Sequence, residues 1–210
     1  MAPGLRPHLT EIKQRLAEGR EKLRARHAAG SPGVQVCAAT SDLLDSVVLD
    51  LFDEATVGSS LPGNVALVAH GGYGRRDVAP YSDVDLMILY SPGADAQVVP
   101  LAKQLMQDLF DVGLQLGQSV RTPRDACQLA MKDAAIFTSL VESRYVAGSV
   151  TLYKRYVERF AKIAKKRARS LISAIEVARG EERGQYGETV YLLTAGQRDS
   201  ITRLILEAVT

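Results

Sequence analysis

Residues 65–89 read VALVAHGGYGRRDVAPYSDVDLMIL. One apolar run ends in His70 and a glycine pair, and a polar turn leads to a second apolar run that opens with Asp83 and Asp85. Side chains two residues apart on a strand point to the same face, so we expect these two carboxylates to lie side by side. The stretch therefore predicts two strands, 65–69 and 84–90, joined by a glycine turn.

Two carboxylates held this close repel each other, and a divalent cation relieves the repulsion. Gly71 and Gly72 leave backbone N–H groups open to a phosphate, and Ser82 adds a hydroxyl. A metal pair can activate an attacking oxygen and hold a leaving pyrophosphate, so this pattern predicts metal-assisted nucleotidyl transfer. Asp83 and Asp85 are the expected catalytic residues and metal ligands, and magnesium is the expected ion because it favours carboxylate and phosphate oxygens.

The other polar residues of the turn allow two interpretations each. Arg75 is a candidate ligand of the nucleotide phosphates, as is Arg76, but either can instead pair with Asp77 on the surface. His70 is a candidate catalytic group, although a histidine at a strand end that is hydrogen-bonded to a backbone partner is favoured. Tyr73 can stack on a base or pack across the turn. A glycine turn before a solvated strand start is the structural alternative to the whole site.

Hydrophobic periodicity and turn residues predict the remaining elements. Thr122 and Asp133 have the positions of helix N-caps. We expect helices over 8–27, 41–55, 96–112, 123–131, 133–141 and 150–183, and a third strand over 114–120. This order predicts an α+β, α/β-like fold with a small mixed sheet flanked by helices, with an N-terminal helical extension (1–33), a core (34–149) and a C-terminal helical extension (150–210).

Composition narrows the class of protein. The 210 residues are 46% hydrophobic and 24% charged, with a net charge of +2, which does not by itself indicate a nucleic-acid partner. Cys37 and Cys127 have no metal-binding spacing, so zinc is not expected. No apolar run is long enough to cross a membrane, and no signal peptide is evident, so we expect no membrane association and a cytoplasmic location. The basic residues after Val150 fit a solvated helix face better than an RNA-binding surface.

The glycine pair, about ten further residues, and Asp83-Val84-Asp85 together resemble the signature of the nucleotidyltransferase superfamily with the polymerase-β-like fold. The longer string is similar to one branch, the PII-protein uridylyltransferases. Further similar segments are GLQLGQSVRT (113–122), ESRYVAG (142–148) and GETVYLL (187–193). The resemblance spans about residues 41–193.

The resemblance implies transfer of UMP from UTP to a tyrosine hydroxyl of a PII-type nitrogen-regulatory protein. Many members of the superfamily carry a third carboxylate on a neighbouring strand, and the expected strand 114–120 has no acid. Nothing in its spacing places Glu142 at the metal site. Full-length members of the branch continue into an HD-type hydrolase domain, which removes the nucleotide, and ACT domains. The only histidines are His8, His27 and His70, so we expect a truncated chain without that hydrolase.

Two alternatives stay open beside this hypothesis. The chain could be a non-catalytic remnant that binds nucleotide or a PII protein, as the missing third acid suggests. It could also be a nucleotidyltransferase that uses an RNA end or a small molecule as acceptor.

Overall fold

The computed structural model describes residues 6–57, 63–79 and 82–186. The similar segment at 187–193 and the expected end of the C-terminal extension lie outside these residues. None of the described helices combines the length and apolar character needed to cross a bilayer.

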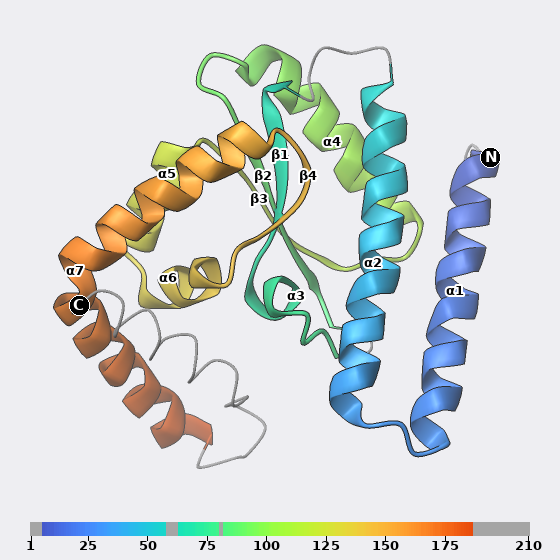
Figure 1. Ribbon diagram of the computed structural model, residues 1–210, viewed down its shortest axis with the longest axis horizontal. Helices are drawn as coiled ribbons and strands as arrows, with labels where there is room; N and C mark the ends of the chain where they lie inside the picture. The colour runs from blue at the N-terminus through green and yellow to red at the C-terminus, as the bar shows by residue number, and fades with distance from the viewer. Residues whose placement is uncertain (1–5, 58–62, 80–81, 187–210) are drawn as a thin grey trace.

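A four-stranded mixed sheet forms the centre of the molecule (Figure 1). It has the order β3-β2-β1-β4, where β1 is antiparallel to β2 and to β4, and β2 is parallel to β3. The strands are β1 (Val65–Ala69), β2 (Val84–Tyr90), β3 (Leu116–Arg121) and β4 (Arg144–Gly148). The two strands predicted around the glycine turn are confirmed residue for residue, and the mixed α+β architecture is confirmed with them.

Helices surround the sheet, and two of their predicted caps are formed. Thr122 Oγ1 accepts a hydrogen bond from the backbone N–H of Asp125 (3.2 Å), and Asp133 Oδ1 accepts one from Ala135 (2.8 Å). The helices are α1 (Pro7–Ala28), α2 (Gly33–Thr56), α3 (Gly71–Arg75), α4 (Asp95–Asp111), α5 (Pro123–Ala130), α6 (Ala134–Val141) and α7 (Val150–Tyr186).

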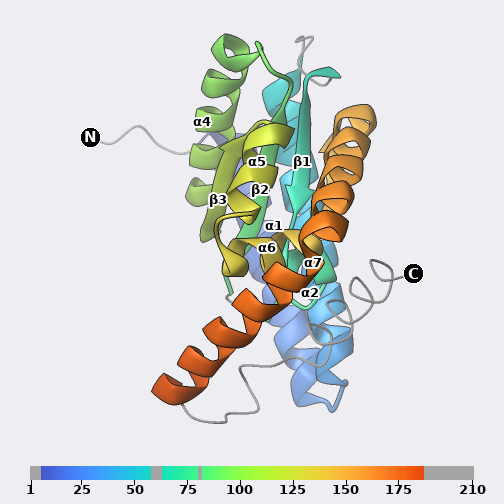
Figure 2. The same ribbon diagram turned by 90° about the vertical axis from the view of Figure 1, so that its left-hand side faces the viewer.

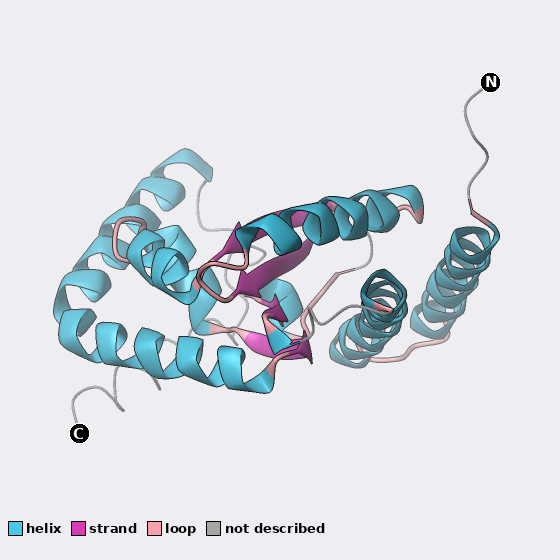
Figure 3. Cartoon of the chain, turned by 90° about the horizontal axis from the view of Figure 1, so that it is seen from above, coloured by secondary structure: helices cyan, strands magenta, loops and turns pink. Residues whose placement is uncertain are grey.

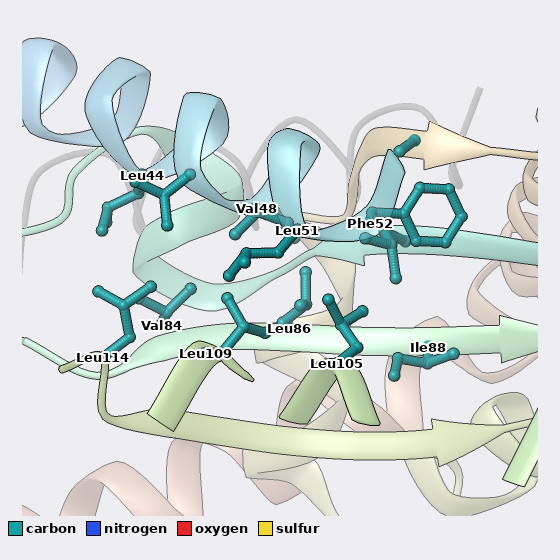
Figure 4. Close-up of a cluster of buried hydrophobic side chains, with 14 of the residues drawn as sticks. Leu44, Val48, Leu51, Phe52, Val84, Leu86, Ile88, Leu105, Leu109 and Leu114 are labelled. Atoms are coloured by element: carbon teal, nitrogen blue, oxygen red, sulfur yellow. The ribbon is translucent and has the colours of Figure 1, made fainter. Parts of the chain in front are cut away.

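The strand alternation divides the core between the two faces of the sheet. Val84, Leu86 and Ile88 of β2 pack with α1, α2 and α4, and Figure 4 shows α2 side chains directed at them. Met87 and Leu89 pack on the opposite face with residues of α5, α6 and α7. Figures 2 and 3 show the strands between these two groups of helices. Asp85 shares the parity of Met87 and therefore lies on the face covered by α5 and α6.

The structure corrects three local predictions. Helix α2 begins at Gly33 rather than at Ser41, because the carbonyl of Pro32 already accepts backbone N–H groups of the first turn and Val36 is buried. The glycine turn contains the short helix α3, which closes with Arg76 in the left-handed region (φ 64°). Strand β4 was not predicted at all.

Candidate nucleotide and metal site

Asp85 is the second residue of β2, and its half-buried carboxylate lies between two glycines. A Cβ atom on Gly71 would lie 2.5 Å from Asp85 Oδ2, and one on Gly117 would lie 2.5 Å from Oδ1. Gly117 is the register partner of Asp85 on β3. Real Cβ atoms do not approach an oxygen this closely, so the carboxylate occupies space that only glycines at both positions leave free.

The start of α3 is fastened to the strand that carries Asp85. The backbone N–H of His70 donates to the carbonyl of Asp85 (3.0 Å), and the N–H of Asp77 donates to the carbonyl of Gly72 (2.9 Å). Gly71 has φ 54°, a conformation that favours glycine. The structure thus brings Gly71 against Asp85, a contact that the sequence did not predict, and places Gly72 one residue further along α3.

Asp83 precedes the first residue of β2 and is exposed. Its negative charge and the burial of Asp85 raise the pKa of Asp85, burial being the larger cause, while the positive charge of Arg75 acts in the opposite direction. The two predicted carboxylates are therefore close enough to interact. They line different hollows, because Asp83 borders an open groove along α4 and β3 whereas Asp85 borders a cavity on the other side of the sheet.

The two arginines of the turn form ion pairs within the protein. Arg75 Nε lies 3.2 Å from Asp77 Oδ2, and the Arg75 side chain is only 11% exposed. Arg76 pairs with Asp42 on α2. Arg75 therefore forms the expected pair with Asp77, although its side chain is largely buried, whereas Arg76 pairs with Asp42 rather than with Asp77. Arg75 also contributes positive charge near Asp85.

A cluster of polar and aromatic groups holds α3 against α2 and β4. Arg144 of β4 binds both carboxylate oxygens of Asp45 (2.9 and 3.0 Å), and Tyr73 Oη donates to Asp45 Oδ1 (2.6 Å). The guanidinium of Arg144 lies over the Tyr73 ring, 5.2 Å from its centroid. Tyr73 is 1% exposed. Of its two interpretations, packing is confirmed. We call these three residues the Asp45 clamp.

His70 lies at the end of β1, where a side chain of α6 supports its ring. Its Nδ1 atom lies 2.8 Å from Ser139 Oγ, and its buried Nε2 atom has no hydrogen-bond partner. Burial lowers the pKa of His70 to about 4, so the ring is neutral at pH 7. The histidine is hydrogen-bonded, as expected, but by a side chain rather than by the backbone.

A cavity of about 280 Å³ opens beside Asp85, and we call it the Asp85 cavity. Its floor comes from alternate residues of β2 and β3, and its walls come from the end of β1 and from α5 and α6. It is lined by His70, Asp85, Met87, Gly117, Ser119, Arg121, Leu129, Ile136, Ser139 and Leu140. Four of these residues, Gly117, Ser119, Arg121 and Ser139, were not expected in the site from the sequence, although the first three belong to the similar segment 113–122.

Ser82 does not line the Asp85 cavity. It borders a small hollow of about 80 Å³ between α1, α2 and the loop before β2. Strand β3 carries no acid, as expected, and Glu142 has one buried carboxylate oxygen without a partner. Among the described residues, no three His, Cys, Asp or Glu side chains gather into a group that could hold a metal ion.

A mixed sheet with a glycine turn after its first strand, and an Asp-x-Asp pair at the start of the next, defines an α+β nucleotidyltransferase-like fold. No family model matches the chain. Several curated proteins that are similar to this chain bear the name bifunctional uridylyltransferase/uridylyl-removing enzyme. Those of Burkholderia orbicola strain AU 1054, Aromatoleum aromaticum and Erythrobacter litoralis are 33%, 30% and 34% identical over 84%, 91% and 72% of this chain.

These alignments cover 20%, 22% and 17% of the three relatives, so the chain spans about a fifth of their length. The resemblance to the uridylyltransferase family is confirmed over most of this chain. In sequence, the chain corresponds to one segment of those bifunctional enzymes.

Proposed function

We propose that this chain transfers UMP from UTP to a tyrosine hydroxyl of a PII-type signalling protein. The observation that carries the proposal is the Asp85 carboxylate, which lies between two glycines at the edge of a cavity and is close enough to Asp83 to feel its charge. The names of the similar proteins support nucleotidyl transfer in general. UTP and the PII acceptor come from the family resemblance.

The donor set suits magnesium. Magnesium is usually held by one or two carboxylates together with substrate phosphates, and it retains several waters. Asp83 and Asp85 would supply the carboxylates, and their mutual repulsion gives them a reason to bind a cation. When bound, the ion would offset the charge that develops on the phosphate oxygens during transfer.

The proposed transfer is an in-line displacement of pyrophosphate at the α-phosphorus of UTP. The acceptor phenol oxygen forms a bond to the α-phosphorus while the bond from that phosphorus to the bridging oxygen of pyrophosphate breaks, and the phenol proton passes to water. Asp83 and Asp85 would hold the cation that positions the triphosphate in line with the acceptor, and Arg75 contributes positive charge beside Asp85.

The direct test is incubation with magnesium, α-labelled UTP and a purified PII protein. We expect label on one tyrosine of the acceptor, as located by mass spectrometry. Asp83→Asn and Asp85→Asn should each reduce labelling roughly a hundredfold or more. Asp53→Asn, which changes an exposed aspartate of α2, should not. Labelling that persists in either site variant would contradict the assignment.

A non-catalytic nucleotide-binding role is a second candidate. The observation that favours it is that no three-residue metal-binding group forms among the described residues. Calorimetric binding of UTP without label transfer to a PII protein, an RNA end or a small hydroxyl compound would select this function. Transfer to any of these acceptors would exclude it.

A further inference from the structure

The Asp85 cavity contains polar groups that the proposed transfer does not use. Arg121 lines the cavity from β3, and its guanidinium forms no hydrogen bond or ion pair with another described residue. Ser119, two residues earlier on the same face, is likewise without a side-chain partner. The buried Nε2 of His70 is a third unpaired polar atom in the lining. Arg121 and Ser119 are partly buried, and His70 Nε2 is fully buried. An unpaired buried polar atom is costly, so this lining favours a polar occupant.

The remaining lining is apolar. Met87 rises from the floor, Leu129 comes from α5, and Leu140 comes from α6. Apolar surfaces combined with a few polar groups are typical of pockets for flat heteroaromatic rings, whose faces are apolar and whose edges form hydrogen bonds. A volume of about 280 Å³ is at the lower end for ligand cavities and favours a single ring over a fused pair.

The order of residues along β2 and β3 indicates how a nucleotide would be oriented in the Asp85 cavity. Asp83 is exposed and lies just before β2. Asp85, two residues later, is the register partner of Gly117 on β3. Arg121 lies four residues beyond Gly117, which is about 13 Å along a parallel strand. The triphosphate therefore belongs at the exposed carboxylate end, and the nucleoside extends toward Arg121.

We propose that the Asp85 cavity holds the nucleobase of the donor, a pyrimidine, and that Arg121 and Ser119 donate hydrogen bonds to its carbonyl oxygens. This inference rests on the proposed function, because it takes the phosphates to lie at Asp83 and Asp85. It assigns base selection to β3 and separates it from phosphate binding at the other end of the cavity.

The test compares binding of UTP, ATP and inorganic tripolyphosphate by calorimetry, each with magnesium. The native chain should bind UTP more tightly than ATP or tripolyphosphate. Arg121→Met should weaken UTP binding about tenfold or more, and Ser119→Ala should weaken it severalfold. Neither change should alter binding of tripolyphosphate. Arg124→Met, at an exposed arginine of α5, is the matched control and should bind all three ligands as the native chain does.

Three outcomes would overturn the inference. Arg121→Met could weaken tripolyphosphate as much as UTP, which would place Arg121 on the phosphates. It could leave UTP binding unchanged, or the native chain could fail to prefer UTP. If Arg121→Met does not fold, Ser119→Ala tests the same cavity with a smaller change of side chain. A preference for UTP that depends on Arg121, without transfer to any acceptor, would support the base pocket and reject the transferase. Absence of all triphosphate binding would reject both.

Discussion

Gly117 and Asp85 are register partners on the parallel strands β3 and β2, and a Cβ atom on Gly117 would lie 2.5 Å from Asp85 Oδ1. A Cβ atom on Gly71 would likewise lie 2.5 Å from the other carboxylate oxygen, Asp85 Oδ2. The position of the carboxylate is therefore set by the absence of two side chains, one contributed by the turn and one by the neighbouring strand.

Gly117→Ala should displace the Asp85 carboxylate without unfolding the protein. The new methyl group meets the end of a side chain rather than backbone, so we expect a loss of about 1 kcal/mol or less in unfolding free energy. Transfer of UMP should fall at least about tenfold, because a displaced ligand misplaces the reacting phosphate. Gly33→Ala, where nothing lies within 4 Å, is the control for urea unfolding and labelling. Equal labelling by both variants would argue against the carboxylate's role.

Asp85→Asn should not lower thermal stability in the absence of metal. Burial and Asp83 raise the pKa of Asp85 above 3.8, so ionisation opposes folding, and the free energy of unfolding decreases as pH rises through the raised pKa. The amide removes that decrease. In melts at pH 7 without metal, the variant should unfold at the native temperature or higher, and magnesium with UTP should stabilise only the native chain. A large drop in melting temperature would show instead that the carboxylate is structural.

His70 should make stability depend on pH. Its folded pKa of about 4 is below the ordinary value of 6.5, so the unfolded chain binds more protons between these values. The free energy of unfolding should therefore decrease as pH falls from about 6.5 to about 4, by up to about 3 kcal/mol. Urea unfolding at several pH values should show a shallower dependence for His70→Gln than for His27→Gln, which changes an exposed histidine. Equal slopes would mean that His70 is protonated in the folded protein.

The Asp45 clamp should contribute more stability than an exposed ion pair. Arg144→Met removes two hydrogen bonds to Asp45 between side chains that are 24% and 18% exposed, and we expect a loss of about 2–4 kcal/mol. Arg15→Met removes a pair with Asp50 whose side chains are 49% and 40% exposed, and should cost about 1 kcal/mol or less. Urea unfolding of both variants measures the difference. Similar losses would show that the clamp does not fasten α3.

The sequence predicted the elements that have strong local signals. The apolar runs of β1 and β2 are bounded by glycine and aspartate, and the caps at Thr122 and Asp133 satisfy backbone N–H groups within a few residues. Strand β4 has no such signal. It has only five residues, four of them partly buried, and it forms at the sheet edge by pairing with β1, which no local pattern encodes.

The candidate site was predictable to the same extent. Asp85 and Gly71 belong to the same strand–turn–strand stretch, which the sequence predicted, although their contact was not predicted. Gly117 reaches Asp85 only through the parallel pairing of β2 and β3, and Ser139 reaches His70 across 69 residues. Closeness in sequence was misleading for Ser82, which is next to Asp83 in the chain but does not line the Asp85 cavity.

In the proposed transferase, Asp83 and Asp85 together bind the cation that accompanies a triphosphate. Electron paramagnetic resonance of Mn²⁺, titrated with UTP into the native chain, measures this directly. We expect a signal of protein-bound Mn²⁺–UTP, distinct from that of Mn²⁺–UTP without protein, which is lost in Asp83→Asn and in Asp85→Asn and kept in Asp53→Asn. A signal that survives in either site variant would contradict joint binding by the two carboxylates.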